Sequence, residues 1–330
     1  ELEPGRRHQG HLGDGGLMLG RTAGGLYWMF RHLERSENTT RLIEAGMRIA
    51  LTRSDDVEKE WKSVVTTAGQ KDAFLERHDR FEQGNVIDFL LRDRTNPSSV
   101  RSVVEAARSN AREVRTALTR EVWEATNDTW LTVRDTLARP VLDRELPDVL
   151  GVIRRESALV RGALHGTMLR NDIYNFARIG TFMERADNTA RILDVKYYVL
   201  LPSASYVGTS LDNVQWETIL RSVSAQRAYR WRSAGDASAM GIADFLILDQ
   251  QLPRSLVFCY RKIDENLGYL AADYGEHHRC HELSHDLLLR LTGRDIGSIF
   301  EDGLHEFLGD CIKATNTLGG AIERDYRFTA

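Results

Sequence analysis

The stretch ERSENTTR, residues 34–41, returns as ERADNTAR at residues 184–191, with five identities and one Glu/Asp exchange. Three further matches follow in the same order, and the spacing between copies changes only from 150 to 156 residues: Trp61 with Trp216, DFLLRD at 88–93 with DFLILD at 244–249, and PSSV at 97–100 with PRSL at 253–256. An ordered repeat of this size predicts two similar halves packed about an approximate twofold axis. A polar motif that occupies the same place in both halves would lie near that axis.

Helical periodicity dominates both halves, so we predict an all-α fold, a multi-helix bundle built from two helical repeats related by a pseudo-twofold axis. The pair Asn96-Pro97 predicts an N-cap followed by the first residue of a helix. In the first half we expect helices at about 22–53, around Trp61, at about 72–79, around Asp88, and without a break from Pro97 to about Leu137. The second half repeats this order from about residue 171, and its last long helix starts at Pro253.

The domain organisation follows from the repeat and from the first residues. Residues 1–17 are rich in Gly, His and Arg and predict a disordered leader. Residues 18–330 predict one helical domain, with the first repeat at about 18–150 and the second at about 151–330. No low-complexity linker separates the halves, so we expect them to share packing.

The composition is that of an ordinary soluble protein, with 42% hydrophobic residues, 28% charged residues and a net charge of −4. There is no basic surplus to indicate nucleic acid, no apolar run of about 18 residues to indicate a membrane span, and no glycine-rich loop to bind the phosphates of ATP. We expect no cofactor. Three cysteines without CxxC spacing fit a reduced, cytoplasmic setting: Cys259, Cys280 and Cys311.

Each ER segment, as we call residues 34–41 and 184–191, places a polar stripe on one side of its helix. At about 100° per residue, the four polar side chains of the first stripe fall within an arc of about 100°. Arg35 lies on the flank and cannot pair with Glu34, because adjacent side chains diverge. Within the stripes we expect four i,i+4 contacts: Glu34 to Asn38, Glu37 to Arg41, Glu184 to Asn188, and Asp187 to Arg191.

Apolar residues surround these stripes, which predicts that both ER helices are buried. Charged groups in a buried helix must be paired or must serve a ligand. We therefore expect the two ER helices to meet, or to border one cavity, and to form a binding site for a ligand, a peptide carboxylate or a phosphate, with the arginines as bidentate anchors. The candidate ligand-binding residues are Glu34, Arg35, Glu37, Asn38, Arg41, Glu184, Arg185, Asp187, Asn188 and Arg191.

Three other interpretations fit the same residues. The charges could form a buried ion-pair network that fixes helix register and does no chemistry. The chain could instead be an enzyme that uses Glu34 and Glu184 as catalytic acid–base groups. A carboxylate-bridged metal centre is less well supported, because di-metal helical bundles pair glutamate with an ExxH histidine that neither ER segment has. Its ligands would be Glu34, Glu37, Glu184 and Asp187.

Other motifs in the chain indicate weaker sites. His281 and His285 match the zinc motif HExxH, but the surrounding stretch is rich in histidine and the first half has no ligand there, so a solvated helix surface is favoured over a metal site. The repeated Asp88 and Asp244 are secondary candidates, and pairing with Arg92 and its neighbours explains them more simply. The repeated tryptophans at 61 and 216 are expected to be core anchors.

Two stretches, MLGRTAGGLYWMFRHLERSENTTRLIEAG from Met18 and TFMERADNTARILD from Thr181, resemble the Alpha-E family of bacterial all-helical domains, which is named for its ER motif. The resemblance runs from Met18 to residues 326–328, and the family's Glu-Arg pairs map onto Glu34-Arg35 and Glu184-Arg185. This chain departs by its leader and by carrying no ATP-grasp domain of its own. Family members sit beside, or are fused to, circularly permuted ATP-grasp ligases, with transglutaminase-like peptidases and proteasome-like hydrolases as further neighbours. The resemblance therefore implies a system that forms and trims peptide or amide bonds.

From these observations we expect a component of an ATP-grasp amide-ligase or peptide-modification system that does not itself bind ATP. It would bind a peptide, a substrate or the ligase through a polar pocket near the ER helices. An ATP-grasp ligase-like protein is the expected partner. A homodimer is the alternative, because like halves make isologous contacts easy to form. We expect the isolated chain to bind rather than to catalyse.

Overall fold

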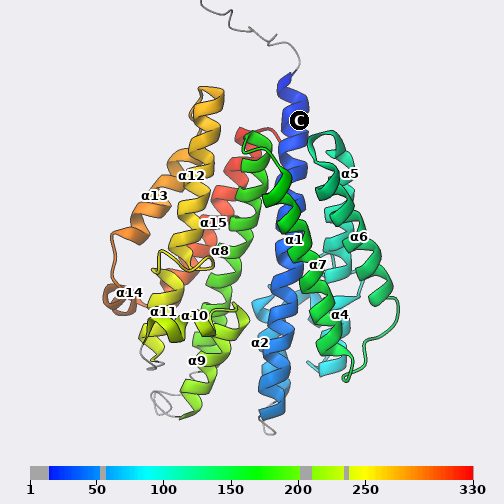
Figure 1. The fold of residues 1–330 in the computed structure, drawn as a ribbon. Coiled ribbons are helices and arrows are strands. Elements are labelled where there is room, and N and C mark those ends of the chain that lie inside the picture. Colours follow the sequence, from blue (N-terminus) through cyan, green and yellow to red (C-terminus); the bar gives the residue numbers. More distant parts are fainter. Residues whose placement is uncertain (1–14, 53–56, 201–209, 234–237, 330) are drawn as a thin grey trace, which may run out of the picture.

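The computed structural model describes residues 15–52, 57–200, 210–233 and 238–329. Within these residues every ordered element is a helix, which confirms the predicted all-α class (Figure 1). The first half contains α1 (Gly15–Thr52), α2 (Val57–Thr67), α3 (Lys71–Leu75), α4 (Gln83–Leu91), α5 (Val100–Glu113), the short η1 (Arg115–Ala117), α6 (Arg120–Thr136) and α7 (Leu146–Thr167). The second half contains α8 (Asp172–Leu200), α9 (Ser210–Ser222), α10 (Gln226–Arg232), α11 (Ala239–Ile247), α12 (Leu256–Tyr274), α13 (Arg279–Thr292), α14 (Ile296–Asp302) and α15 (Leu304–Asp325).

The two helices that carry the ER segments, α1 and α8, lie side by side at the centre of the molecule (Figure 1). Helices α5, α6 and α7 cover one side of this pair, and α12, α13 and α15 cover the other. The chain wraps both sides because α1 and α8 are apolar around most of their circumference. The side chains of Leu26, Phe30, Ile179 and Phe182 are all buried. The predicted shared packing of the halves is confirmed by the contact between α1 and α8.

Corresponding helices make corresponding contacts in the two halves. Helix α1 packs on α5 and α7, as α8 packs on α12 and α15, and α5 packs on α6 as α12 packs on α13. The short helices also cross between halves, because α2 touches α8 and α9 touches α1. The correspondence requires α7 to belong to the first half, because its contact with α1 matches that of α15 with α8. The predicted boundary between the repeats, at about residue 150, falls inside α7. A twofold rotation relating the halves stays a prediction.

Helices α1 and α8 approach each other very closely at Gly180. A Cβ atom built at this residue would lie 2.2 Å from the carbonyl oxygen of Tyr27 on α1. That distance is far below van der Waals contact, so only glycine permits this crossing. The close crossing holds the ER segments, about one turn further along α8 and about two turns further along α1, within side-chain reach of each other.

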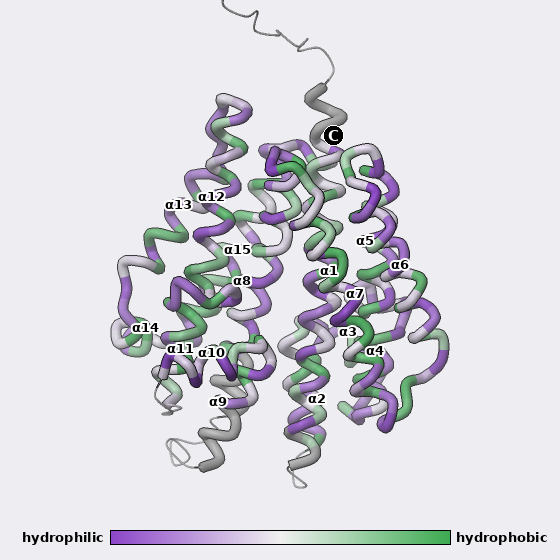
Figure 2. Tube along the Cα trace, in the orientation of Figure 1, coloured by the Kyte–Doolittle hydropathy of each residue, from purple (hydrophilic) through white to green (hydrophobic). Residues whose placement is uncertain are grey.

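The outer helices have one buried and one solvent-facing side. Figure 2 shows hydrophobic and hydrophilic residues alternating along outer helices such as α13, as expected for helices that pack with one face on the core. Trp61 on α2 and Trp216 on α9 are buried, so the prediction that they anchor the core is confirmed. None of the described helices is long and apolar enough to cross a membrane.

The matched proline turns start their helices differently from the prediction. Asn96 is not the N-cap of α5, because its side chain accepts from the N–H of Ser98 inside the turn. The N-cap is Ser99, and its counterpart Ser255 caps α12 by accepting from the N–H of Phe258. A serine hydroxyl satisfies a helix-terminal N–H without needing proline at the first helical position. Both helices therefore begin three residues after the proline.

Two further boundaries differ from the prediction. The helix expected from Pro97 to about Leu137 is broken into α5 and α6, because Thr119 caps α6 and the chain reverses so that α6 packs on α5. The reversal buries Leu118, which a continuous helix would leave beyond the core. Residues 1–14 of the predicted leader lie outside the described residues. Helix α1 begins at Gly15, within the range predicted for the leader, and the predicted domain bounds stay a prediction.

Candidate functional site

The two ER segments are joined by a reciprocal pair of ion pairs between α1 and α8. Arg185 donates to both oxygens of Glu34, at 2.9 and 3.0 Å. Arg35 donates to both oxygens of Glu184, at 2.6 and 2.9 Å. Each Glu-Arg dipeptide therefore gives its carboxylate to one pair and its guanidinium to the other. Neighbouring side chains on a helix diverge, and this divergence lets one dipeptide serve two pairs.

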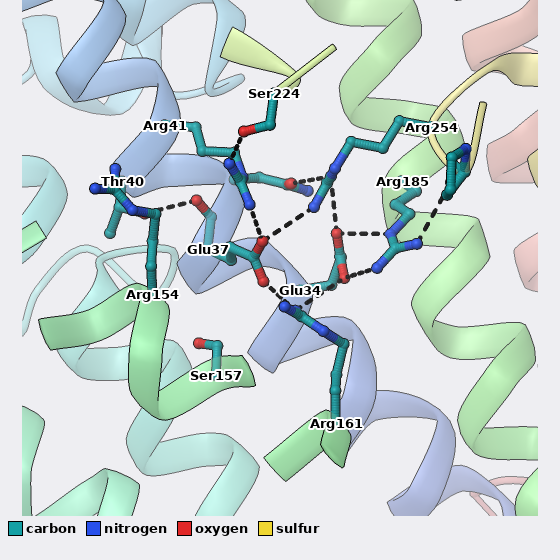
Figure 3. Close-up of polar contacts among 12 residues, drawn as sticks. Glu34, Glu37, Thr40, Arg41, Arg154, Ser157, Arg161, Arg185, Ser224 and Arg254 are labelled. Atoms are coloured by element: carbon teal, nitrogen blue, oxygen red, sulfur yellow. Dashed lines mark hydrogen bonds and ion pairs between the residues drawn. The ribbon is translucent and has the colours of Figure 1, made fainter. Parts of the chain in front are cut away.

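Around Glu34 and Glu37, three further arginines complete a buried charge cluster, drawn in Figure 3. Arg254, from the turn before α12, lies 2.9 Å from Glu34 and 3.2 Å from Glu37, and it donates to Asn38 Oδ1 at 2.9 Å. Arg161 on α7 and Arg41 on α1 both pair with Glu37. With Arg185, six arginine and glutamate side chains from four segments thus meet at one end of the α1–α8 contact.

The second cluster, around Glu184 and Asp187, is less crowded. Arg31, one turn before Arg35, also pairs with Glu184 at 3.0 Å. Arg191 pairs with Asp187 Oδ2 at 2.7 Å. The place that Arg254 takes in the first cluster corresponds to Ser98 in the second, because the two residues follow the matched prolines.

Two of the four predicted i,i+4 contacts are confirmed, the pairs of Glu37 with Arg41 and of Asp187 with Arg191. The contacts predicted between Glu34 and Asn38 and between Glu184 and Asn188 are not among the hydrogen bonds of the described residues. Arginines from other helices reach these carboxylates instead, since a charged donor competes better for a carboxylate than a neutral amide does. The prediction that the ER helices meet is confirmed by the cross-helix pairs.

The glutamates of both clusters are held in the ionised form. Burial raises the pKa of Glu184, but the guanidinium groups of Arg35 and Arg31 outweigh it and lower the pKa to about 2. In the same way, Arg185 and Arg254 overcome burial and hold the pKa of Glu34 well below its usual range. A carboxylate with so low a pKa is a weak base near neutral pH, so acid–base catalysis is poorly served by these groups.

Acid should weaken the fold through these carboxylates. Their pKa is lower in the folded than in the unfolded chain, so their contribution is complete above pH ~4.5 and is lost as the pH falls toward ~2. For Glu184 this loss amounts to about 3 kcal/mol of the free energy of unfolding. Urea titrations between pH 7 and pH 2.5 measure it. The variant Glu184→Gln should show a shallower decline over that window, and parallel curves for the two proteins would contradict the assignment.

A cavity of about 150 Å³ lies beside the second cluster, between α1, α8 and the turn after α2. Six of the candidate residues line it: Arg35, Asn38, Glu184, Asp187, Asn188 and Arg191. The remaining lining residues are Thr39, Leu42, Thr67, Ala68, Gly69, Gln70 and Ser98. Gly69 has a φ of 71°, a left-handed conformation that glycine adopts without strain, and this turn closes the cavity.

Three of the residues that line the cavity each have one buried polar atom that lacks a hydrogen-bond partner within the described part of the chain. These atoms are the amide nitrogens Nδ2 of Asn38 and Asn188 and the carboxylate oxygen Oδ1 of Asp187. Asn38 is 3% exposed and Asn188 is 8% exposed. Leaving a buried donor or acceptor unpaired costs about 1–3 kcal/mol each, so such groups in a native protein call for a ligand or ordered water.

The candidate residues thus differ in whether they line the cavity. Glu34, Glu37 and Arg185 belong to the ion-pair network and do not line the cavity, whereas Arg41 lines a separate hollow with Ser224 and Gln226. The sequence reasoning missed several residues of the clusters. The repeated proline before Arg254 could have indicated that residue, and the position of Arg31, one turn before Arg35, could have indicated Arg31. No sequence pattern indicated Arg161. The missed residues are Arg31, Ser98, Arg161 and Arg254.

The other motifs fall outside this site. His281 is buried and its imidazole contacts the hydroxyl of Tyr326, whereas His285 is 61% exposed at its side chain, so the prediction of a solvated surface is wrong for His281. No group of three His, Cys, Asp or Glu in the described residues has an arrangement that could hold a metal. Asp88 pairs with Arg92, as its simpler interpretation predicted.

Comparison with known proteins agrees with the geometry of the paired ER segments. The chain is 22% identical over 307 residues to two proteins described as uncharacterized, Mb2597 of Mycobacterium bovis and MT2643 of Mycobacterium tuberculosis. The match covers 87% of this chain and 34% of each relative, so the chain spans about a third of their length. No solved structure matches it. Residues 18–326 match a family described as a predicted alpha-helical domain with a conserved ER motif, so the chain belongs to the Alpha-E family.

Proposed function

We propose that this chain is the ligand-binding, non-ATP-binding component of an ATP-grasp amide-ligase or peptide-modification system. The cavity beside the ER pairs would be its binding site. The observation that carries this proposal is the set of unpaired buried atoms on Asn38, Asn188 and Asp187, which all belong to residues lining one cavity. The choice of partner is supported by the resemblance to the Alpha-E family, whose members sit beside, or are fused to, ATP-grasp ligases.

The ER pairs serve as the frame of this site rather than as its chemistry. The oxygens of Glu34 and Glu184 are taken up by arginines from the opposite helix, which leaves them little capacity for a ligand. The pairs hold α1 and α8 in one register and so fix the positions of Asn38 and Asn188. Glu34 and Arg185 act only in the network, whereas Arg35 and Glu184 belong to the network and also line the cavity.

The relatives support a role beside other protein segments. In the two mycobacterial proteins the matching region occupies 34% of a longer chain, so it has other polypeptide attached to it there. An interface with a ligase would need about 1,200–2,000 Å² of surface and a core depleted in charge.

Size-exclusion chromatography of this chain with an ATP-grasp ligase-like protein tests the partnership. We expect one peak containing both proteins at micromolar concentrations, and a change in ligase turnover when this chain is added. Two separate peaks with unchanged turnover would contradict the proposal. A peak of twice the chain's mass in the absence of ligase would favour the homodimer instead.

A further inference from the structure

The repeat has two equivalent places beside the ER helices, and only one of them is filled by the protein. In the first, the guanidinium of Arg254 lies against Glu37 and Asn38. Their counterparts in the second are Asp187 and Asn188, which line the cavity. The residue matching Arg254 there is Ser98, whose side chain is too short to fill the space.

The two turns that carry Arg254 and Ser98 have the same backbone hydrogen bonds. Ser255 N–H donates to the carbonyl of Leu252, and Ser99 N–H donates to the carbonyl of Asn96. The difference between the two places is therefore one of side chain and not of backbone. In the filled place a cation lies on the carboxylate, and in the open place the matching carboxylate keeps its Oδ1 unpaired among the described residues.

The open place also has more unpaired hydrogen-bond donors than the single unpaired acceptor, Asp187 Oδ1, can accept from. The amide nitrogens of Asn38 and Asn188 are unpaired among the described residues. Arg35 uses its Nε and Nη2 for Glu184, and Arg191 uses its Nε for Asp187. The other terminal nitrogens of both guanidiniums make no further hydrogen bond with the described chain. A carboxylate is an acceptor with about four lone-pair sites and matches such a set of donors.

We propose that this cavity binds a small free zwitterion of the α-amino-acid class, with its ammonium group on Asp187 Oδ1 and its carboxylate on the amide nitrogens of Asn38 and Asn188 and the outer nitrogens of Arg35 and Arg191. The inference rests on the proposed function, in which this cavity is the ligand site. An α-amino acid carries both groups on one carbon atom, so one molecule satisfies donors and acceptor together. Neither group is left buried without a partner.

The size and lining of the cavity favour a short side chain. Its volume of about 150 Å³ is below the ~300 Å³ at which sites for drug-sized ligands begin. Among the described residues that line it, only Leu42 and Ala68 carry aliphatic side chains. Glycine, alanine and serine fit this description better than large apolar amino acids.

Isothermal titration calorimetry of the full chain with alanine, and with compounds that each lack one feature of it, tests the inference. Alaninamide lacks the carboxylate, N-acetylalanine lacks the ammonium group and mimics a peptide C-terminus, and lactate replaces the ammonium group by a hydroxyl. We expect saturable binding of alanine and at least tenfold weaker binding of all three analogues. Equal binding of N-acetylalanine or lactate would overturn the zwitterion, because a carboxylate alone would then suffice.

Variants locate the binding within the cavity. Ser98→Arg places in the open cavity the side chain that fills its counterpart, and it should abolish alanine binding. Ser109→Arg, on the exposed side of α5, is the matched control and should bind as the parent does. Asp187→Asn keeps the shape and removes the charge, so it should weaken alanine binding at least tenfold without affecting acetate. Alanine binding that survives both Ser98→Arg and Asp187→Asn would overturn the inference.

The outcomes separate this inference from the proposed function. If acetate binds, alanine binds no better, and Ser98→Arg abolishes both, the cavity is a ligand site but the ligand is not a zwitterion. If neither compound binds, the zwitterion is wrong, and the chromatography with the ligase decides the proposed function independently.

Discussion

Replacing Glu34 by Gln is expected to lower the free energy of unfolding by about 3–5 kcal/mol, because removing one partner of a buried ion pair leaves the other charge uncompensated. Glu34 is 2% exposed and faces the guanidinium groups of Arg185 and Arg254. Glutamine keeps the shape of the side chain but cannot neutralise them. Urea denaturation at pH 7 followed by circular dichroism measures the change.

The exposed pair of Arg120 and Glu124 provides the control for this substitution. Their side chains are 79% and 50% exposed, and such pairs contribute about 0–1 kcal/mol. Glu124→Gln should therefore leave the denaturation midpoint almost unchanged. Because Glu34 does not line the cavity, the folded fraction of Glu34→Gln should keep its ligand binding. Equal effects of the two substitutions would show that the buried pair does not stabilise the fold.

Replacing Gly180 by Val should destabilise the fold by about 3 kcal/mol, the upper end of the cost of overpacking a core. The new Cβ would lie 2.2 Å from the backbone carbonyl of Tyr27, and backbone cannot rotate away as a flexible side chain can. Helices α1 and α8 would have to move apart, which would also lengthen the ion pairs of Glu34 and Glu184. Thermal unfolding of the variant measures the combined effect.

Gly162 on α7 is the matched control, because nothing lies within 4 Å of a Cβ built there. Gly162→Ala should raise the free energy of unfolding by about 0.4–1 kcal/mol, since alanine has the higher helix propensity and a less flexible unfolded chain. Opposite signs at the two glycines would identify the helix crossing as the cause. Destabilisation of similar size at both positions would point to a general intolerance of the helices to substitution.

Several features of the fold followed from local sequence. The helical periodicity predicted the all-α class, the repeated tryptophans predicted buried anchors, and the stripe on each ER helix predicted the pairs of Glu37 with Arg41 and Asp187 with Arg191. These features depend on residues within a few positions of each other, so they can be recognised in a single sequence. The break between α5 and α6 was missed because no glycine or proline marks it, and the turn is decided by packing of α6 back onto α5.

The sequence alone determined that this chain is helical, that its ER motif occurs twice, and that the motif's charges must lie in a buried place. Only the tertiary structure decided how those charges divide. It pairs Glu34 with Arg185 and Glu184 with Arg35 across the helix contact, brings Arg254 into one cluster and leaves Ser98 beside an open cavity in the other. The physical reason is distance along the chain. A periodicity places residues on a face of their own helix. Which side chain from 151 or 217 residues away reaches that face depends on how the helices cross.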